Sequence, residues 1–125
     1  MQFKIDTKPT FTVITPLNSN IDANMTAALR QKWKALTESG SGNAIIDLSC
    51  CTSADESAFA QLRELHEEVY GNNQSIVFTN LQPPVWKVVK HEEADILLNI
   101  APTMQEAVDV VSMEILEREL FDEES

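Results

Sequence analysis

A short apolar run, followed by a polar turn and an amphipathic segment between residues 44 and 70, most constrains how this chain can fold. Residues 44–49 have the pattern of a buried strand, and residues 50–56 form a polar connection. In the next segment apolar side chains recur at helical spacing: Ala58, Phe59, Leu62, Leu65 and Val69. This order predicts a strand, a tight connection and a helix whose first turn is exposed at the carboxyl end of the strand.

The start of this helix has the pattern of a capping box over residues 53–56. The Ser53 oxygen and the Glu56 side chain would satisfy backbone amides that have no partner at a helix start. Asp55 is an alternative cap, with Glu56 and Ser57 then in the first turn. Both interpretations place two carboxylates at the positive end of a helix, where negative charge and phosphate groups are favoured.

These residues resemble the signature of the STAS domain, a family that includes bacterial anti-sigma factor antagonists and sulfate transporters. Residues 47–49 match the family's Asp-Leu-Ser, and residues 55–58 lie where the family has Asp-Ser-Ser-Gly. In the family, the serine directly after the second aspartate is the regulatory phosphorylation site. Here that position is Glu56, whereas Ser57 matches the second serine and Ala58 replaces the glycine. The resemblance therefore implies Glu56 and Ser57 as the regulatory positions.

The resemblance implies a non-enzymatic protein-interaction module similar to an anti-sigma factor antagonist. In the family, the unphosphorylated domain binds a serine-kinase anti-sigma factor and frees the sigma factor, and phosphorylation breaks this complex. The implied partner surface is the start of the central helix with its adjoining loops: Asp22, Asn24, Thr52, Ser53, Asp55, Glu56, Ser57 and Ala58. Two alternatives stay open, a small STAS subunit of a lipid-transport ABC complex and a nucleotide-binding module.

Strands and helices alternate along the rest of the chain. Further strands are expected at residues 2–6, 11–17, 75–80 and 96–100, and further helices at residues 22–39, at 85–90 and from 103 onward. The order ββαβαβαβα predicts a single α/β domain with a mixed, mainly parallel sheet and an antiparallel first hairpin. The STAS family has this order. Residues 1–112 are therefore expected to form a STAS-like domain, and residues 113–125 a helical extension with an acidic tail.

Charge favours a protein partner for this chain. Acidic residues number 20 against 9 basic ones, a net charge of -11, which disfavours binding to nucleic acid or to anionic membranes. The first residues lack an apolar signal core, and no run of roughly 18 apolar residues could span a membrane. We therefore expect a cytoplasmic protein with no direct membrane insertion.

Residues that could support catalysis are scarce. His66 and His91 have no evident nucleophile beside them, and the three glycines are turn residues, so there is no Gly-rich phosphate loop. Cys50 and Cys51 are adjacent, which suits neither an ordinary disulfide nor a metal-binding pair, and they are interpreted as packing residues. We expect no enzymatic activity, no cofactor and no metal site.

Apolar residues away from the signature give three further expectations. Phe59, Leu62 and Leu65 should pack on the residues of two strands: Ile45, Ile76 and Val77. Trp33 should lie in the core, whereas Trp86 lies off the apolar stripe of its helix and could be exposed. The carboxyl-terminal segment carries several apolar residues, which predict either a fold-back onto the sheet or a homodimer contact: Met113, Leu116, Leu120 and Phe121.

Overall fold

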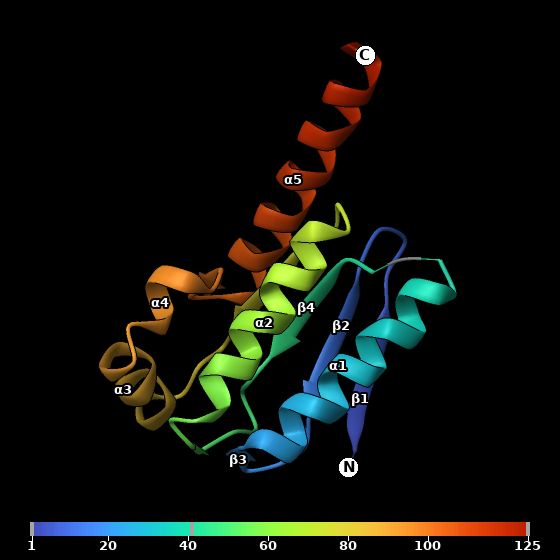
Figure 1. Ribbon diagram of the computed structural model, residues 1–125. Coiled ribbons are helices and arrows are strands. Elements are labelled where there is room, and N and C mark those ends of the chain that lie inside the picture. Colours follow the sequence, from blue (N-terminus) through green and yellow to red (C-terminus); the bar gives the residue numbers. More distant parts are fainter. Residues whose placement is uncertain (1, 41, 125) are drawn as a thin grey trace.

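The computed structural model describes residues 2–40 and 42–124, with side chains up to residue 121. A five-stranded sheet forms its centre, with the strand order β1-β2-β4-β6-β7 (Figure 1). The five strands are β1 (Phe3–Thr7), β2 (Thr12–Pro16), β4 (Ala44–Asp47), β6 (Ile76–Thr79) and β7 (Ile100–Ala101). The β1–β2 pair is antiparallel and the other three pairs are parallel, which confirms the expected mixed, mainly parallel sheet.

Helices cover both faces of this sheet. On one face lie α1 (Ala23–Glu38) and α2 (Ala58–Gly71), and α3 (Pro83–His91) and the short α4 (Ala94–Leu97) lie beside α2 (Figure 1). The long helix α5 (Met104–Glu124) packs its first half on the opposite face and then extends beyond the body of the domain. None of the described helices is both long enough and apolar enough to cross a membrane.

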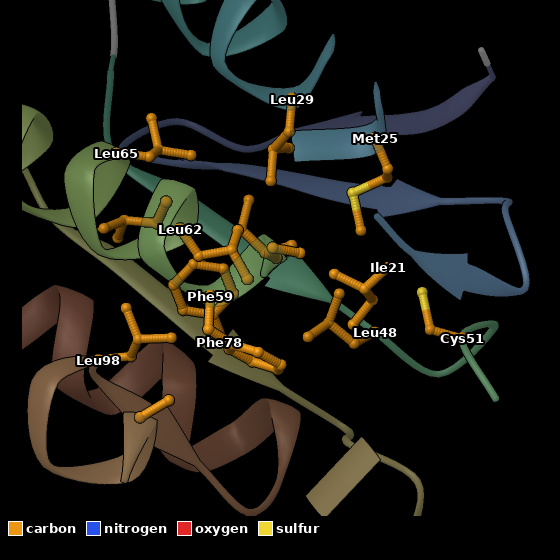
Figure 2. Packing of buried hydrophobic residues seen from close by; sticks show 14 of the residues in the cluster. Ile21, Met25, Leu29, Leu48, Cys51, Phe59, Leu62, Leu65, Phe78 and Leu98 are labelled. Carbon is orange, nitrogen blue, oxygen red and sulfur yellow. The ribbon is translucent and has the colours of Figure 1, made fainter. Parts of the chain in front are cut away.

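Most of the core lies between the sheet and the α1–α2 layer. One row of apolar residues crosses the sheet on this side, because Ile14 pairs with Ile46 and Ile46 pairs with Phe78. Helix residues at the expected spacing cover this row, including Leu29 of α1 and Leu62 of α2 (Figure 2). Their side chains are at most 1% exposed, so the amphipathic patterns of both helices correctly predicted their buried faces.

The expected partners of α2 were only partly right. Ile76 lies in the same core cluster as the α2 residues, as predicted. Ile45 and Val77, in contrast, pack with Ala107 and Val111 of α5 on the other face. The reason is strand geometry, because successive side chains of a strand point to opposite faces of the sheet. Ile45 and Val77 directly precede Ile46 and Phe78, so their side chains point to the α5 face.

The prediction of a strand over residues 96–100 was wrong in most of its length. Ala94–Leu97 is the single helical turn α4, and the strand β7 is only Ile100–Ala101. A short apolar run does not by itself distinguish a strand from a buried helical turn. Here Leu98 donates its amide to Ala94 O at 2.8 Å, which closes the helical turn before the strand begins.

Side-chain oxygens cap the starts of α1 and α5. Asp22 Oδ1 accepts the amide hydrogen of Met25 at 2.9 Å at the start of α1. Thr103 Oγ1 accepts the amide hydrogen of Glu106 at 3.2 Å at the start of α5. Each bond satisfies one amide that has no partner inside the helix.

Both tryptophans contact the main core. Trp33 is 3% exposed, as predicted, and its indole nitrogen donates to Gly42 O at 2.7 Å. Trp86 is partly buried against the same core, with Lys90 Nζ 5.7 Å from the ring centroid. The alternative of an exposed Trp86 is therefore wrong.

The extension of α5 does not fold back onto the sheet. Four of its apolar side chains are between 51% and 72% exposed: Met113, Leu116, Leu120 and Phe121. Among residues 113–121, whose side chains the structure describes, Ile115 packs against the α5 side of the core. Of the two expectations for these residues, the fold-back is therefore wrong, and association with a second copy stays a prediction.

Candidate functional site

The connection between β4 and α2 is anchored by two buried side chains. Leu48 is 3% exposed and its amide donates to Thr79 O at 3.0 Å, which continues the β4–β6 ladder. Cys51 is fully buried near Leu48 (Figure 2). Its thiol donates to Asn18 O at 3.3 Å. Burial raises the pKa of the Cys51 thiol to about 11, so Cys51 packs as a small apolar residue and is a poor nucleophile at neutral pH.

A small second sheet joins this connection to the loop before α1. In it, β3 (Asn20–Ile21) runs parallel to β5 (Ser53–Ala54). Asp55 donates its amide to Ile21 O at 2.8 Å, and Ser53 Oγ donates to Asn20 Oδ1 at 2.9 Å. These bonds place the residues around Asp22 beside those around Asp55, although 33 positions separate them in the chain.

This pairing overturns the predicted capping box. Ser53 is a strand residue whose side chain bonds to Asn20, and α2 begins only at Ala58. Among the described residues, neither Ser53 nor Asp55 accepts an α2 amide hydrogen with a side-chain oxygen, and Ser57 at the N-cap position makes no side-chain capping bond. The pattern misled because a capping box is local, whereas the β3–β5 pairing depends on a distant segment of the chain.

Glu56 and Ser57 lie in a turn at the start of α2. The amide of Ala58 donates to Asp55 O at 3.1 Å and that of Phe59 to Glu56 O at 3.3 Å, which fixes the backbone of the turn. The Glu56 side chain is 63% exposed, and Ser57 is exposed as well. Both are therefore accessible to a partner.

The structure brings the predicted site residues onto one edge of the domain, with one exception. Six of the eight are exposed: Asn24, Thr52, Ser53, Asp55, Glu56 and Ser57. Asp22 is partly exposed and caps α1 through Oδ1. Ala58 is fully buried beneath the turn, so it supports the site from below and cannot itself contact a partner.

Two residues at this edge were missed by sequence reasoning. His91 is the last residue of α3, and Glu92 is its C-cap. The Nδ1 atom of His91 lies 3.6 Å from Glu56 Oε1 and 3.6 Å from Glu92 Oε2. No local pattern indicates this group, because Glu56 and His91 are brought together only by the packing of α3 beside β5.

A shallow hollow adjoins the Glu56 turn. It encloses about 310 Å³ between the start of α2 and α4. Its rim carries charged groups from Glu56, Arg63 and Glu92, and its floor is apolar, with Phe59 and Leu98. The edge therefore offers a partner exposed carboxylates beside a small apolar depression.

The fold and this edge define a class of protein: a mixed α/β domain whose exposed polar loops surround the start of a central helix. A family model for the STAS domain matches residues 2–107. The chain therefore belongs to the STAS domain family, as the signature predicted.

Solved structures agree with this assignment at the level of the fold. An anti-sigma factor antagonist from Mycobacterium paratuberculosis has 18% identity and a TM-score of 0.73, with 89% of this chain and 93% of that chain covered. A serine-to-glutamate variant of RsbS from Moorella thermoacetica has 18% identity and a TM-score of 0.71, with 94% and 99% covered. The anti-sigma factor antagonist SpoIIAA in its unphosphorylated form has 19% identity and a TM-score of 0.67, with 89% and 96% covered. No curated protein sequence matches this chain.

Proposed function

We propose that this chain is a non-enzymatic interaction module of the anti-sigma factor antagonist kind, which exchanges partners with a serine-kinase anti-sigma factor. The observation that supports this most is the exposed Glu56 carboxylate at the start of α2. In the STAS signature this is the position of the phosphorylated serine. The proposed function is therefore partner switching in which the permanent negative charge of Glu56 replaces the reversible charge of a phosphoserine.

The surface proposed for the partner consists of the two loops joined by the β3–β5 ladder. Asp55 and Glu56 give it negative charge, and Asn24 and Thr52 add exposed polar groups. The chain as a whole carries a net charge of -11. A partner with a basic surface would be attracted to this edge, which would raise its association rate at low ionic strength.

Glu56 can imitate a phosphoserine only in part. A phosphoserine carries about -1.5 to -2 charges and three acceptor oxygens, whereas a glutamate carries one charge and two oxygens. If charge alone separates the family complex, Glu56 holds this protein in the released state towards an ordinary kinase partner. A serine-to-glutamate change is also what the RsbS variant carries, and that variant keeps the STAS fold.

An affinity capture from native lysate tests the proposed function. Tagged wild-type chain and the Glu56→Ser variant would each be used as bait, and bound proteins would be identified by mass spectrometry. We expect a kinase-like anti-sigma factor with the variant and little of it with the wild type. Recovery of an ABC ATPase in its place would indicate a lipid-transport subunit, and capture of nucleotide alone would indicate a nucleotide-binding module. Either result would overturn the proposal.

A matched control separates the position of the charge from its loss. Glu64 is an exposed glutamate on α2, about two helical turns further along the chain than Glu56, which lies in the turn before this helix. The Glu64→Ser variant loses the same charge as Glu56→Ser but keeps the turn at the start of α2. If both variants recover the kinase equally, the effect comes from net charge, and Glu56 has no special role.

A further inference from the structure

We propose that Glu56, His91 and Glu92 form a binding site for a divalent transition-metal ion, for which Zn²⁺ is the best match. One ligand atom from each of the three residues lies within 4.8 Å of the other two. The His91 Nδ1 atom is 3.6 Å from an oxygen of each glutamate. Ligand atoms about 2.0 to 2.2 Å from a tetrahedral Zn²⁺ lie roughly 3.3 to 3.6 Å apart, so small side-chain rotations would bring all three onto one ion.

The backbone beneath the three side chains is held in place by the fold. Two buried residues, Val85 and Val89, fix α3 against the core. The amide of Glu92 donates to Val88 O at 2.9 Å, so the end of α3 is well defined. The side chains themselves are 69% exposed at His91, 63% at Glu56 and 32% at Glu92, which leaves them free to turn towards an ion.

The chemistry of the three ligands favours zinc over calcium or magnesium. A neutral imidazole nitrogen suits Zn²⁺, whereas Ca²⁺ and Mg²⁺ prefer sites made of oxygen ligands alone. Two carboxylates would balance the charge of the ion, and one or more coordination positions would stay open to water. The site is therefore an open one that takes a small, exchangeable transition-metal ion.

The two helix ends at the site act in opposite directions on a cation. His91 and Glu92 lie at the C-terminal end of α3, whose partial negative charge favours a cation. Glu56 lies before the N-terminal end of α2, whose partial positive charge disfavours one. The helix ends therefore roughly cancel, and the three side chains determine the affinity.

A metal ion bound at Glu56 would regulate the proposed partner switching. This regulatory role rests on the proposed function, whereas the metal site itself does not. An ion held by Glu56 would offset the charge that imitates phosphoserine. It would also tie the turn before α2 to the end of α3. Addition of Zn²⁺ would then change how much kinase the wild-type chain captures, but not how much the Glu56→Ser variant captures.

Isothermal titration calorimetry of the chelator-treated full chain with ZnCl₂ tests the site directly. We expect one ion per chain, with binding weakened at least about tenfold in His91→Ala and in Glu56→Gln, because loss of a ligand costs no less than loss of an outer hydrogen-bond partner. MgCl₂ and CaCl₂ should bind far more weakly. In NMR spectra, zinc should shift the imidazole signals of His91 and leave those of His66 in place.

Two controls address the other groups that could hold zinc. Cys50 has an exposed thiol, so Cys50→Ser should leave zinc binding unchanged. Glu64→Gln removes an exposed carboxylate outside the site and should also have no effect. Absence of zinc binding by the wild type, loss of binding in Cys50→Ser, or unchanged binding in His91→Ala would each overturn the proposed site.

The metal site and the proposed function can fail separately. A chain that binds zinc through His91 but captures no kinase keeps the metal site and loses the proposed function. A chain that captures the kinase in the Glu56→Ser form but binds no zinc keeps the function and loses the metal site.

Discussion

At the scale of single residues, Tyr70 shows how α5 is tied to the central helix. Its hydroxyl donates to Glu114 Oε1 at 2.7 Å and accepts from Asn99 Nδ2 at 2.8 Å. Burial, and after it the hydrogen bond to Glu114, raises the pKa of Tyr70 to about 12. Beside it, burial lowers the pKa of His66, whose buried Nε2 atom has no hydrogen-bond partner among the described residues. Both groups are therefore held in their neutral forms.

The raised pKa of Tyr70 gives a test in alkaline solution. Tyr70 is the only tyrosine, so absorbance at about 295 nm reports its ionisation alone. Because the folded pKa is raised above the unfolded value near 10, the Tyr70 contribution to stability is fully present below pH 10. It is lost as the pH rises through about 12. We expect a midpoint near 12 in the folded chain and a lower one in Glu114→Gln. A midpoint near 10 with native circular dichroism would show that Tyr70 is not buried in this way.

Leu62 tests the packing of the main core. Its side chain is 1% exposed in the cluster with Ile76 and Phe78, so Leu62→Ala should leave a cavity and cost about 2 to 5 kcal/mol. Urea denaturation measures this loss in the free energy of unfolding. The exposed Glu64→Ala is a neighbouring control on α2 and should change it little. A loss below about 0.5 kcal/mol for Leu62→Ala would mean that α2 does not pack on the sheet as described.

At the scale of elements, the helical periodicities were read correctly, whereas pairings between distant segments were not predicted. The helical spacing in α1 and α2 predicted their buried faces. The β3–β5 pairing and the approach of His91 to Glu56 depend on segments more than 30 positions apart, and no local signal marks either. The run at residues 96–98 failed for another reason, since so short an apolar segment is compatible with either element.

Apolar residues lie on two opposite faces of α5. Val111 and Ile115 face the sheet, whereas Met113, Leu116 and Leu120 lie on the opposite side of the helix at about 100° per residue. Spacings of three and four residues produce an apolar seam of the kind that packs against another helix. We expect the same seam of a second copy to cover it, giving a homodimer.

Substitutions in the seam test this association without disturbing the core. Leu116→Ser with Leu120→Ser should give a monomer in sedimentation experiments, whereas the wild type should sediment as a dimer. Because Glu117 and Glu119 flank the seam, repulsion between copies should weaken with salt, so the dimer should be more stable at high ionic strength. Identical sedimentation of both proteins at every salt concentration would argue against the homodimer.

At the scale of the whole molecule, the fold places one edge of exposed polar loops opposite the end where α5 extends (Figure 1). The sequence was sufficient to predict the STAS family, the sheet type and the location of this edge. It could not show that His91 lies beside Glu56, because that approach depends on how α3 packs beside β5, which is a property of the assembled domain.

The most direct test of the central claim is the affinity of the captured kinase for the wild type and for Glu56→Ser, with Glu64→Ser as the control. If Glu56 acts as a fixed substitute for phosphoserine, Glu56→Ser binds more tightly than the wild type, and radioactive ATP labels the introduced serine. A partner with a complementary Arg or Lys would give the opposite result, a loss of about 1.5 to 3 kcal/mol on removing a charge-assisted hydrogen bond. That loss, or phosphate mapped to Ser57 or Thr52 in the wild type, would contradict a permanently released state.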